Sequence, residues 1–267
     1  MVWASCALES ACVVKAGVSI HYDSSARHGH WWQRHFPRWE PTTFHVFRHF
    51  VRPDAVVLDV GGWIGTTAVW LAAVARKVVV LEPAEAAFEE MQKHVAKNPD
   101  RRHRLSLLRA ALGPRRGFVH MTNYGDSADQ VAMAGGSLTS MWDIRELLSA
   151  FPDLEEVSLV KIDAEGSERD IIPALAEFLK QTRPVLLVSL HPYALMDEEL
   201  AVLVSQLRVI CPYLYGFYMV NGTWMLADFQ TPMSKVSGGL PQVADPADDA
   251  LCIWQPAPLD FFYDLET

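Results

Sequence analysis

Apolar runs alternate with segments of helical periodicity along most of this chain. The runs that predict buried strands lie at 56–60, 77–81, 105–110, 158–162 and 185–190. The segments that predict helices lie at 66–75, 85–96, 168–180 and 197–210, with Pro173 expected to break the third. Such alternation predicts a mostly parallel, doubly wound, Rossmann-like α/β sheet with helices on both faces, in the strand order 3-2-1-4-5.

The remaining segments are less regular. Strands are expected at 118–121, 213–220, 223–227 and 251–255, a short helix at 143–150, and a tight turn at 221–222. Polar, glycine-containing loops are expected at 122–140 and 230–249. The first 50 residues fit neither pattern. We therefore divide the chain into an N-terminal cap segment, residues 1–50, and an α/β domain, residues 51–267.

The cap segment is rich in histidine and tryptophan, most densely in HGHWWQRHFPRW at 28–39. Stacking on nucleic-acid bases and a histidine metal cluster are two alternatives, but the chain is acidic and the spacing matches no common metal site. Packing of the tryptophans against the core is a third. The fourth is a cap that also lines an acceptor pocket, with Trp32, His35 and Glu40 as the substrate-binding candidates.

The amino-acid composition limits which binding partners and which cellular compartment we expect. The 267 residues are 50% hydrophobic and 21% charged, and the net charge of −9 argues against a nucleic-acid partner. No apolar run reaches the roughly 18 residues of a membrane span, so we expect no membrane partner. The 4 cysteines are scattered and the N-terminus has no basic leader. This favours buried or free thiols over disulfides or zinc, and a cytoplasmic protein.

A glycine turn joins the first predicted strand to the first predicted helix in the stretch VVLDVGGWIGTT. Gly61, Gly62 and Gly65 allow a ligand to approach the backbone closely. The N–H groups at the start of the helix point toward such a ligand. The turn therefore predicts a nucleotide-type cofactor site, and the alternative is a turn that holds no ligand.

Two acidic residues indicate which cofactor this site would take. Glu82 ends the second strand, where a carboxylate is placed to accept the hydroxyls of a ribose. Asp59 lies at the start of the turn, where it is unfavourable beside the pyrophosphate of NAD. It suits the ammonium and sulfonium groups of S-adenosylmethionine, which we therefore predict as the cofactor.

Two further ionisable residues, Asp163 and His191, end the fourth and fifth strands. In the expected strand order they follow Glu82 and Asp59 along one edge of the sheet, where an acceptor would meet the methyl group of the cofactor. Glu165 is a substrate-binding candidate close by. The alternatives are that Asp163 or Ser167 caps the next helix, that Glu165 is a loop or capping residue and that His191 is structural.

Four motifs resemble the FkbM-type methyltransferases: VVLDVGGWIG at 56–65, VVVLEP at 78–83, LVKIDAEGSERDII at 159–172 and LLVSLHP at 186–192. Residues 38–62 also resemble the segment that leads into the first strand of that family. The resemblance implies S-adenosylmethionine-dependent methylation of hydroxyl groups, often on sugars or natural products. It places Asp59, Gly61, Gly65 and Glu82 at the cofactor. Trp63 departs from the asparagine that is common in the family.

We therefore expect an O-methyltransferase that acts on a small-molecule or glycan acceptor. Asp163 or His191 would act as general base, or both would bind a divalent metal that acidifies the hydroxyl. A carboxylate-rich site favours magnesium over zinc. An N-methyltransferase, a binding module without turnover and an NAD oxidoreductase are the alternative functions.

Overall fold

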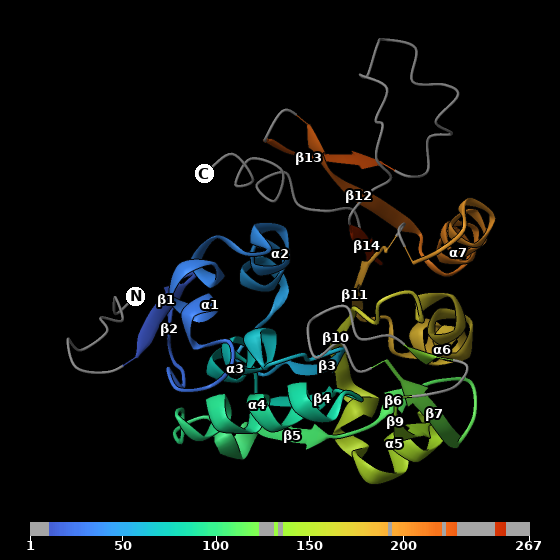
Figure 1. The fold of residues 1–267 in the computed structure, drawn as a ribbon. Coiled ribbons are helices and arrows are strands. Elements are labelled where there is room, and N and C mark those ends of the chain that lie inside the picture. Colours follow the sequence, from blue (N-terminus) through green and yellow to red (C-terminus); the bar gives the residue numbers. More distant parts are fainter. Residues whose placement is uncertain are drawn as a thin grey trace.

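The computed structural model describes residues 11–122, 131–132, 136–191, 194–220, 223–228 and 249–254. Its centre is an eight-stranded sheet (Figure 1). In sheet order the strands are β13 (Thr223–Asp228), β12 (Tyr213–Val220), β14 (Asp249–Ile253), β11 (Val185–Ser189), β10 (Val157–Ile162), β3 (Val56–Val60), β4 (Lys77–Leu81) and β5 (Leu105–Leu108).

Five neighbouring strands, from β11 through β10, β3 and β4 to β5, are parallel. Their order confirms the predicted 3-2-1-4-5 arrangement and the doubly wound α/β class. Beyond β11 the pairing turns antiparallel through β14, β12 and β13. Ligands of such sheets bind at the carboxyl ends of the parallel strands, so this edge is where the predicted site residues have to meet.

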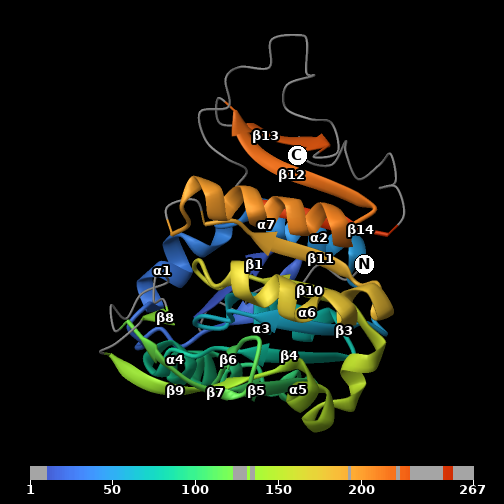
Figure 2. The same cartoon turned by 90° about the vertical axis from the view of Figure 1, so that its right-hand side faces the viewer.

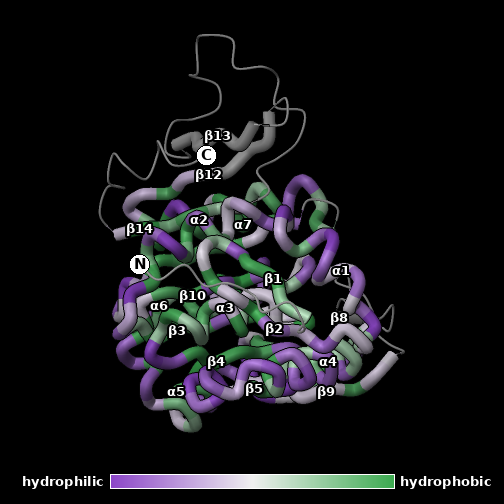
Figure 3. Tube along the Cα trace, turned by 90° about the vertical axis from the view of Figure 1, so that its left-hand side faces the viewer, coloured by the Kyte–Doolittle hydropathy of each residue, from purple (hydrophilic) through white to green (hydrophobic). Residues whose placement is uncertain are grey.

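Helices cover both faces of the sheet (Figures 1 and 2). One face carries α2 (Pro41–Phe50), α3 (Thr66–Val74) and α4 (Glu85–Ala96), and the other carries α5 (Ile144–Ala150), α6 (Glu168–Thr182) and α7 (Asp197–Ile210). The strands between them are apolar on both sides, and Figure 3 shows hydrophobic colour along β3, β4 and β10. Val57 packs into one core and Leu58 into the other, because successive side chains of a strand point to opposite faces.

Two segments differ from the predictions. Helix α6 runs through Pro173 without a break, because the missing N–H leaves only the carbonyl of Arg169 without a helical partner, and Arg169 is exposed to water. The stretch predicted as a loop at 122–140 contains part of a second, four-stranded sheet. In sheet order its strands are β6 (Ala111–Leu112), β9 (Ser137–Trp142), β7 (Gly117–Met121) and β8 (Val131–Ala132).

Short 3-10 helices lie at Phe36–Arg38, Arg102–Arg104 and Pro152–Glu156. The predicted turn at 221–222 lies outside the described residues, and so do residues 230–248 of the loop predicted at 230–249. Asp249, the last residue of that predicted loop, begins β14. None of the helices in the described part of the chain has the length and apolar character that crossing a membrane requires.

The cap segment folds as a hairpin followed by helices. The hairpin strands β1 (Cys12–Lys15) and β2 (Val18–His21) were not predicted, and α1 (Gly29–Arg34) follows them. Trp32 and Phe36 are fully buried in the core that also contains α3. The prediction that the cap tryptophans pack against the core is therefore confirmed for Trp31, Trp32 and Trp39, while Trp3 lies outside the described residues. The domain boundary at residue 50 stays a prediction.

A buried polar network ties the cap to α4. The Glu90 carboxylate accepts hydrogen bonds from the backbone N–H and Nδ1 of His28, at 2.9 Å each, and lies 3.3 Å from Nε2 of His94. Burial acts to raise the pKa of Glu90, but its contacts with His94 and His28 outweigh this effect and lower the pKa from 4.5 to about 2. The ionised carboxylate is thus the form that holds the cap in place.

Substituting Glu90→Gln is expected to destabilise the protein at neutral pH by about 1–3 kcal/mol, since it leaves buried donors without a charged acceptor. The pKa of Glu90 is depressed in the folded state, so its contribution is present above about 4.5 and is lost as the pH falls toward about 2. Thermal melts across this pH range should show the gap between wild type and variant closing. The exposed neighbour Glu89→Gln is the control, and an equal effect of both variants would contradict the assignment.

The cysteines differ from the prediction because three of them are disulfide-bonded. Cys211, at the end of α7, forms a disulfide with Cys252 of β14, and the two Cα atoms are 5.5 Å apart. Cys12 is disulfide-bonded as well. The expectation of free or buried thiols is therefore wrong for these residues, and the expectation of a cytoplasmic protein loses the part of its basis that rested on free thiols.

Candidate functional site

The predicted ionisable residues meet at the carboxyl edge of the parallel strands. Asp59 of β3 stands opposite Lys161 of β10 in the sheet register. Side chains in register on adjacent strands point to the same face, and so does a side chain two positions further along a strand. Asp163 therefore joins Asp59 and Lys161 on one face, at the end of β10.

Contacts with β4 and with the end of β10 determine the conformation of the glycine turn after β3. A Cβ at Gly61, where φ is +85°, would lie 1.7 Å from the backbone oxygen of Asp163. The N–H groups of Gly61 and Gly62 both donate to the carbonyl of Leu81, at 2.9 and 3.0 Å. Gly65 starts α3 in the left-handed conformation. The glycines thus allow the turn to pack between β4 and β10, and their contact with a cofactor stays a prediction.

Asp59 is fully buried. Its Oδ2 accepts a hydrogen bond of 2.6 Å from Thr67 Oγ1 at the start of α3, and its Oδ1 lies 3.8 Å from Lys161 Nζ. Burial raises the pKa of Asp59, and Lys161 and Thr67 oppose this shift. Asp59 therefore holds the start of α3 beside the glycine turn and pairs with Lys161. Its predicted contact with the cofactor remains untested.

Glu82 connects the end of β4 to the glycine turn. Its two carboxylate oxygens accept hydrogen bonds of 2.8 Å from the backbone N–H groups of Trp63 and Ala84. These bonds fix the carboxylate at the sheet edge. The predicted contact of Glu82 with the hydroxyls of a ribose stays untested.

Lys161 is a site residue that the sequence prediction missed. It is fully buried, and its Nζ donates a 2.8 Å hydrogen bond to Asp163 Oδ2. Burial would lower the pKa of Lys161, but the charges of Asp163 and Asp59 outweigh it and raise this pKa. The signal was present in the sequence, because a lysine in the middle of the apolar run LVKI is costly to bury unless carboxylates surround it.

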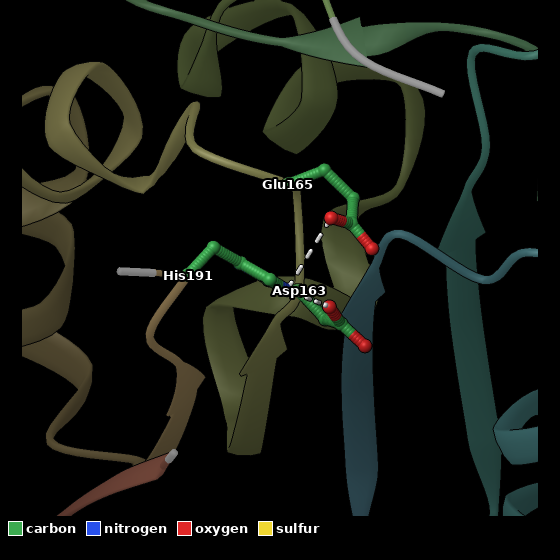
Figure 4. Close-up of side chains that lie close together, drawn as sticks. All are labelled: Asp163, Glu165 and His191. Atoms are coloured by element: carbon green, nitrogen blue, oxygen red, sulfur yellow. Dashed lines mark ion pairs between the residues drawn. The ribbon is translucent and has the colours of Figure 1, made fainter. Parts of the chain in front are cut away.

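Asp163, Glu165 and His191 converge from the end of β10, the loop after it and the end of β11 (Figure 4). His191 Nε2 lies 3.2 Å from Asp163 Oδ1 and 3.7 Å from Glu165 Oε2. Asp163 makes no cap for α6, whose N-cap position is Ser167. The helix-cap alternative for Asp163 is therefore wrong, and the predicted meeting of Asp163 with His191 is confirmed.

Glu168, also missed by the sequence prediction, organises this cluster. Its buried carboxylate accepts hydrogen bonds from the backbone N–H groups of Ala164, at 2.7 Å, and Gly166, at 2.8 Å, and lies 2.9 Å from His191 Nδ1. Glu165 and Gly166 take the left-handed conformation, with φ of 51° and 98°. Glu168 thus holds a tight loop and orients the imidazole, so that Nε2 faces the other two carboxylates.

The charges of the cluster shift two pKa values. Burial acts to lower the pKa of His191, but hydrogen bonds and charges from Asp163 and Glu168 outweigh it and raise this pKa to about 11. Burial acts to raise the pKa of Asp163, and Lys161 and His191 outweigh it and hold this pKa below its usual range. In the protein without ligands, His191 carries a proton at neutral pH and Asp163 remains ionised.

The substrate-binding candidates of the cap have different positions. Trp32 is fully buried and its indole N–H bonds to His94, so the prediction that it contacts an acceptor is wrong. His35 is exposed at the end of α1, and no hydrogen bond or ion pair joins it to the cluster within the described ranges. Glu40 is near enough to Lys161 for its charge to raise the pKa of that lysine, so the cap reaches the site electrostatically.

Trp63, the residue of the glycine turn that departs from the FkbM-type pattern, lies under the cap. Its ring packs against Trp31 and Trp39 at centroid distances of 4.9 and 5.9 Å. Its backbone N–H holds Glu82. Trp63 therefore makes an aromatic contact between the cap and the glycine turn, where the FkbM-type pattern has an asparagine.

No protein-family model matches the chain, and no curated protein matches it. Among solved structures, the methyltransferase FkbM from Methylobacillus flagellatus KT is 16% identical, with a TM-score of 0.49, over 67% of this chain and 44% of that chain. A putative rRNA-methylase from Clostridium thermocellum is 11% identical, with a TM-score of 0.46, over 79% and 91%. A putative methyltransferase from Streptococcus mutans in complex with SAH is 11% identical, with a TM-score of 0.43, over 69% and 93%. This chain thus spans less than half the length of the FkbM chain, and we base its function on its own residues.

Proposed function

We propose that this protein is an S-adenosylmethionine-dependent O-methyltransferase that acts on a hydroxyl of a small molecule or glycan. One observation carries the proposal. The glycine turn and Glu82 lie at the ends of β3 and β4, and Asp163 and His191 lie at the ends of the next two strands along the same edge. A cofactor held by the first pair would present its methyl group to an acceptor held by the second.

The reaction needs an aligned acceptor and a place for one proton. The acceptor oxygen attacks the methyl carbon, an O–C bond forms, and the S–C bond breaks to leave neutral S-adenosylhomocysteine. Alignment of oxygen, carbon and sulfur supplies much of the acceleration. The carboxylate of Asp163, which lies 3.2 Å from His191, would receive the hydroxyl proton and pass it to water. Protonated His191, held by Glu168, would position the acceptor oxygen.

The charge of the cluster supports an uncharged acceptor. The three carboxylates of Asp163, Glu165 and Glu168 outnumber the two cationic groups beside them, His191 and Lys161. Carboxylates repel phosphate or carboxylate groups and accept hydrogen bonds from hydroxyls. A sugar or another polyol therefore suits the site better than an anionic acceptor.

Isothermal titration calorimetry checks the cofactor. We expect S-adenosylhomocysteine to bind, and Glu82→Ala to weaken binding by about 1–3 kcal/mol, since charge-assisted hydrogen bonds are lost. The exposed Glu85→Gln is the matched control on the neighbouring helix. Binding of NAD without binding of S-adenosylhomocysteine would overturn the cofactor assignment.

Transfer of a labelled methyl group checks the acceptor class. The protein is incubated with methyl-labelled S-adenosylmethionine and, separately, with pools of sugars, other alcohols and amines. Methyl ethers are the expected products. Products from the amine pool alone would replace the proposal by an N-methyltransferase, and cofactor binding without product from any pool would replace it by a binding module.

A further inference from the structure

The Asp163–Glu165–His191 cluster has the composition of a metal site. Each residue offers one ligand atom, and the three atoms lie within 4.8 Å of one another. Their side chains are only 18%, 15% and 10% exposed. An ion between them would therefore be enclosed by protein on one side and would still be reachable from the other.

The distances between the ligand atoms fit a small divalent ion. Protein nitrogen and oxygen ligands lie about 2.0–2.2 Å from such ions, which separates two ligands at a right angle by about 3.0 Å. The Nε2 atom of His191 lies 3.2 Å from Asp163 Oδ1 and 3.7 Å from Glu165 Oε2. These two distances exceed that separation by about 0.2 and 0.7 Å.

Glu168 and Lys161 orient these ligands from outside the cluster. A histidine that binds a metal commonly donates its other ring N–H to a carboxylate, which fixes the ring. Glu168 occupies that place 2.9 Å from Nδ1 of His191, and it holds the loop of Glu165 through the Gly166 N–H. Lys161 binds Oδ2 of Asp163, so Oδ1 is the oxygen that faces His191.

We propose that Asp163, Glu165 and His191 bind one divalent cation of the first transition row, with Glu168 as the group that orients His191. One imidazole nitrogen and two carboxylate oxygens form a mixed ligand set. Imidazole suits transition metals better than magnesium, and carboxylates suit manganese. Mn²⁺ is therefore the appropriate ion for a test, rather than the magnesium favoured by the sequence.

The evidence for the binding site is this geometry alone. Only the use of the ion in catalysis rests on the proposed function. A cation at this place would bind the acceptor oxygen and lower the pKa of its hydroxyl. The methyl group would still move from sulfur to oxygen, and the hydroxyl proton would leave to water. Asp163 and His191 would then act together as ligands of one ion, which would take the place of the proton on Nε2 of His191.

Titration of the full chain with Mn²⁺ tests the site, with the free ion followed by electron paramagnetic resonance. We expect one ion per chain. Glu165→Gln and His191→Gln should weaken binding at least tenfold, and Glu168→Gln about tenfold to hundredfold, the usual effect of removing such an outer partner. Glu177→Gln, on the exposed side of α6, is the control and should bind as the wild type does.

Absence of stoichiometric Mn²⁺ binding by the wild type would overturn the proposal, and so would unchanged binding in Glu165→Gln. Should His191→Gln fail to fold, judged by circular dichroism, Glu165→Gln decides, because Glu165 lies in a loop. The titration contains neither cofactor nor acceptor. Failure of methyl transfer would therefore leave this result standing, and failure of Mn²⁺ binding would leave the methyltransferase proposal standing.

Discussion

Replacing Asp163 with asparagine is expected to lower the rate of methyl transfer by about 10²–10⁴-fold. The carboxylate faces Nε2 of His191 across 3.2 Å and is held by Lys161. The amide keeps the shape but loses the charge, so it can neither accept the hydroxyl proton nor serve as a charged ligand. Affinity for S-adenosylhomocysteine should change little, because the proposed function places Asp163 at the acceptor and not at the cofactor. Single-turnover kinetics and calorimetry measure the two quantities separately.

The variant His191→Gln tests the other member of this pair. It should lower the rate to a similar extent, and the double variant should be scarcely slower than either single variant, since residues that act as one unit give non-additive losses. Thermal melts serve as the control, because Asp163→Asn also removes a partner of the buried Lys161. Near-normal rates in both folded single variants would remove this pair from the mechanism.

The second large effect is expected for Gly61→Ala. The new Cβ would lie 1.7 Å from the backbone oxygen of Asp163, at a residue with φ of +85°. Overpacking costs about 1–3 kcal/mol and a left-handed non-glycine residue about 1–2 more. The end of β10 must therefore move away from the turn, and we expect both a strong loss of stability and a loss of S-adenosylhomocysteine binding.

Gly17→Ala is the matched control for this substitution. Gly17 has a similar φ of +81°, but a Cβ there meets nothing within 4 Å. It should cost only the backbone strain, about 1–2 kcal/mol, and leave cofactor binding intact. Denaturant unfolding and calorimetry of both variants are the measurements. Equal effects at the two positions would show that the contact between the turn and β10 is unimportant.

The parallel sheet was predictable because its strands are buried on both faces. Val56–Val60 and Lys77–Leu81 are apolar except for Asp59 and Lys77, and the helix between them begins directly after Gly65. Right-handed crossovers then leave few strand orders. This is why Asp59, Glu82, Asp163 and His191 could be assigned to one edge before their contacts were known.

The inner structure of the site was less predictable, because it depends on register and on contacts between distant segments. Lys161 gains its role only from standing opposite Asp59 on the neighbouring strand. Glu168 becomes an orienting group only because His191, 23 residues later, lies 2.9 Å away. In the same way, Cys211 and Cys252 are 41 residues apart, and their spacing carries no pairing signal.

For Trp32, the sequence predicted a contact with an acceptor that the structure does not allow. A tryptophan beside histidines suggested a surface for an acceptor, but the residue is fully buried. The hairpin β1–β2 was missed because its strands have only four residues each. Strands this short give little periodicity.

A crystal structure of the protein with S-adenosylhomocysteine is the most direct test of how the cofactor and the acceptor site are arranged. We predict that the ribose hydroxyls bind the Glu82 carboxylate at the end of β4. We also predict that the sulfur atom faces Asp163 and His191 at the ends of β10 and β11. A complex in which the ligand lies away from Glu82, or turns its sulfur away from Asp163 and His191, would contradict the proposed site.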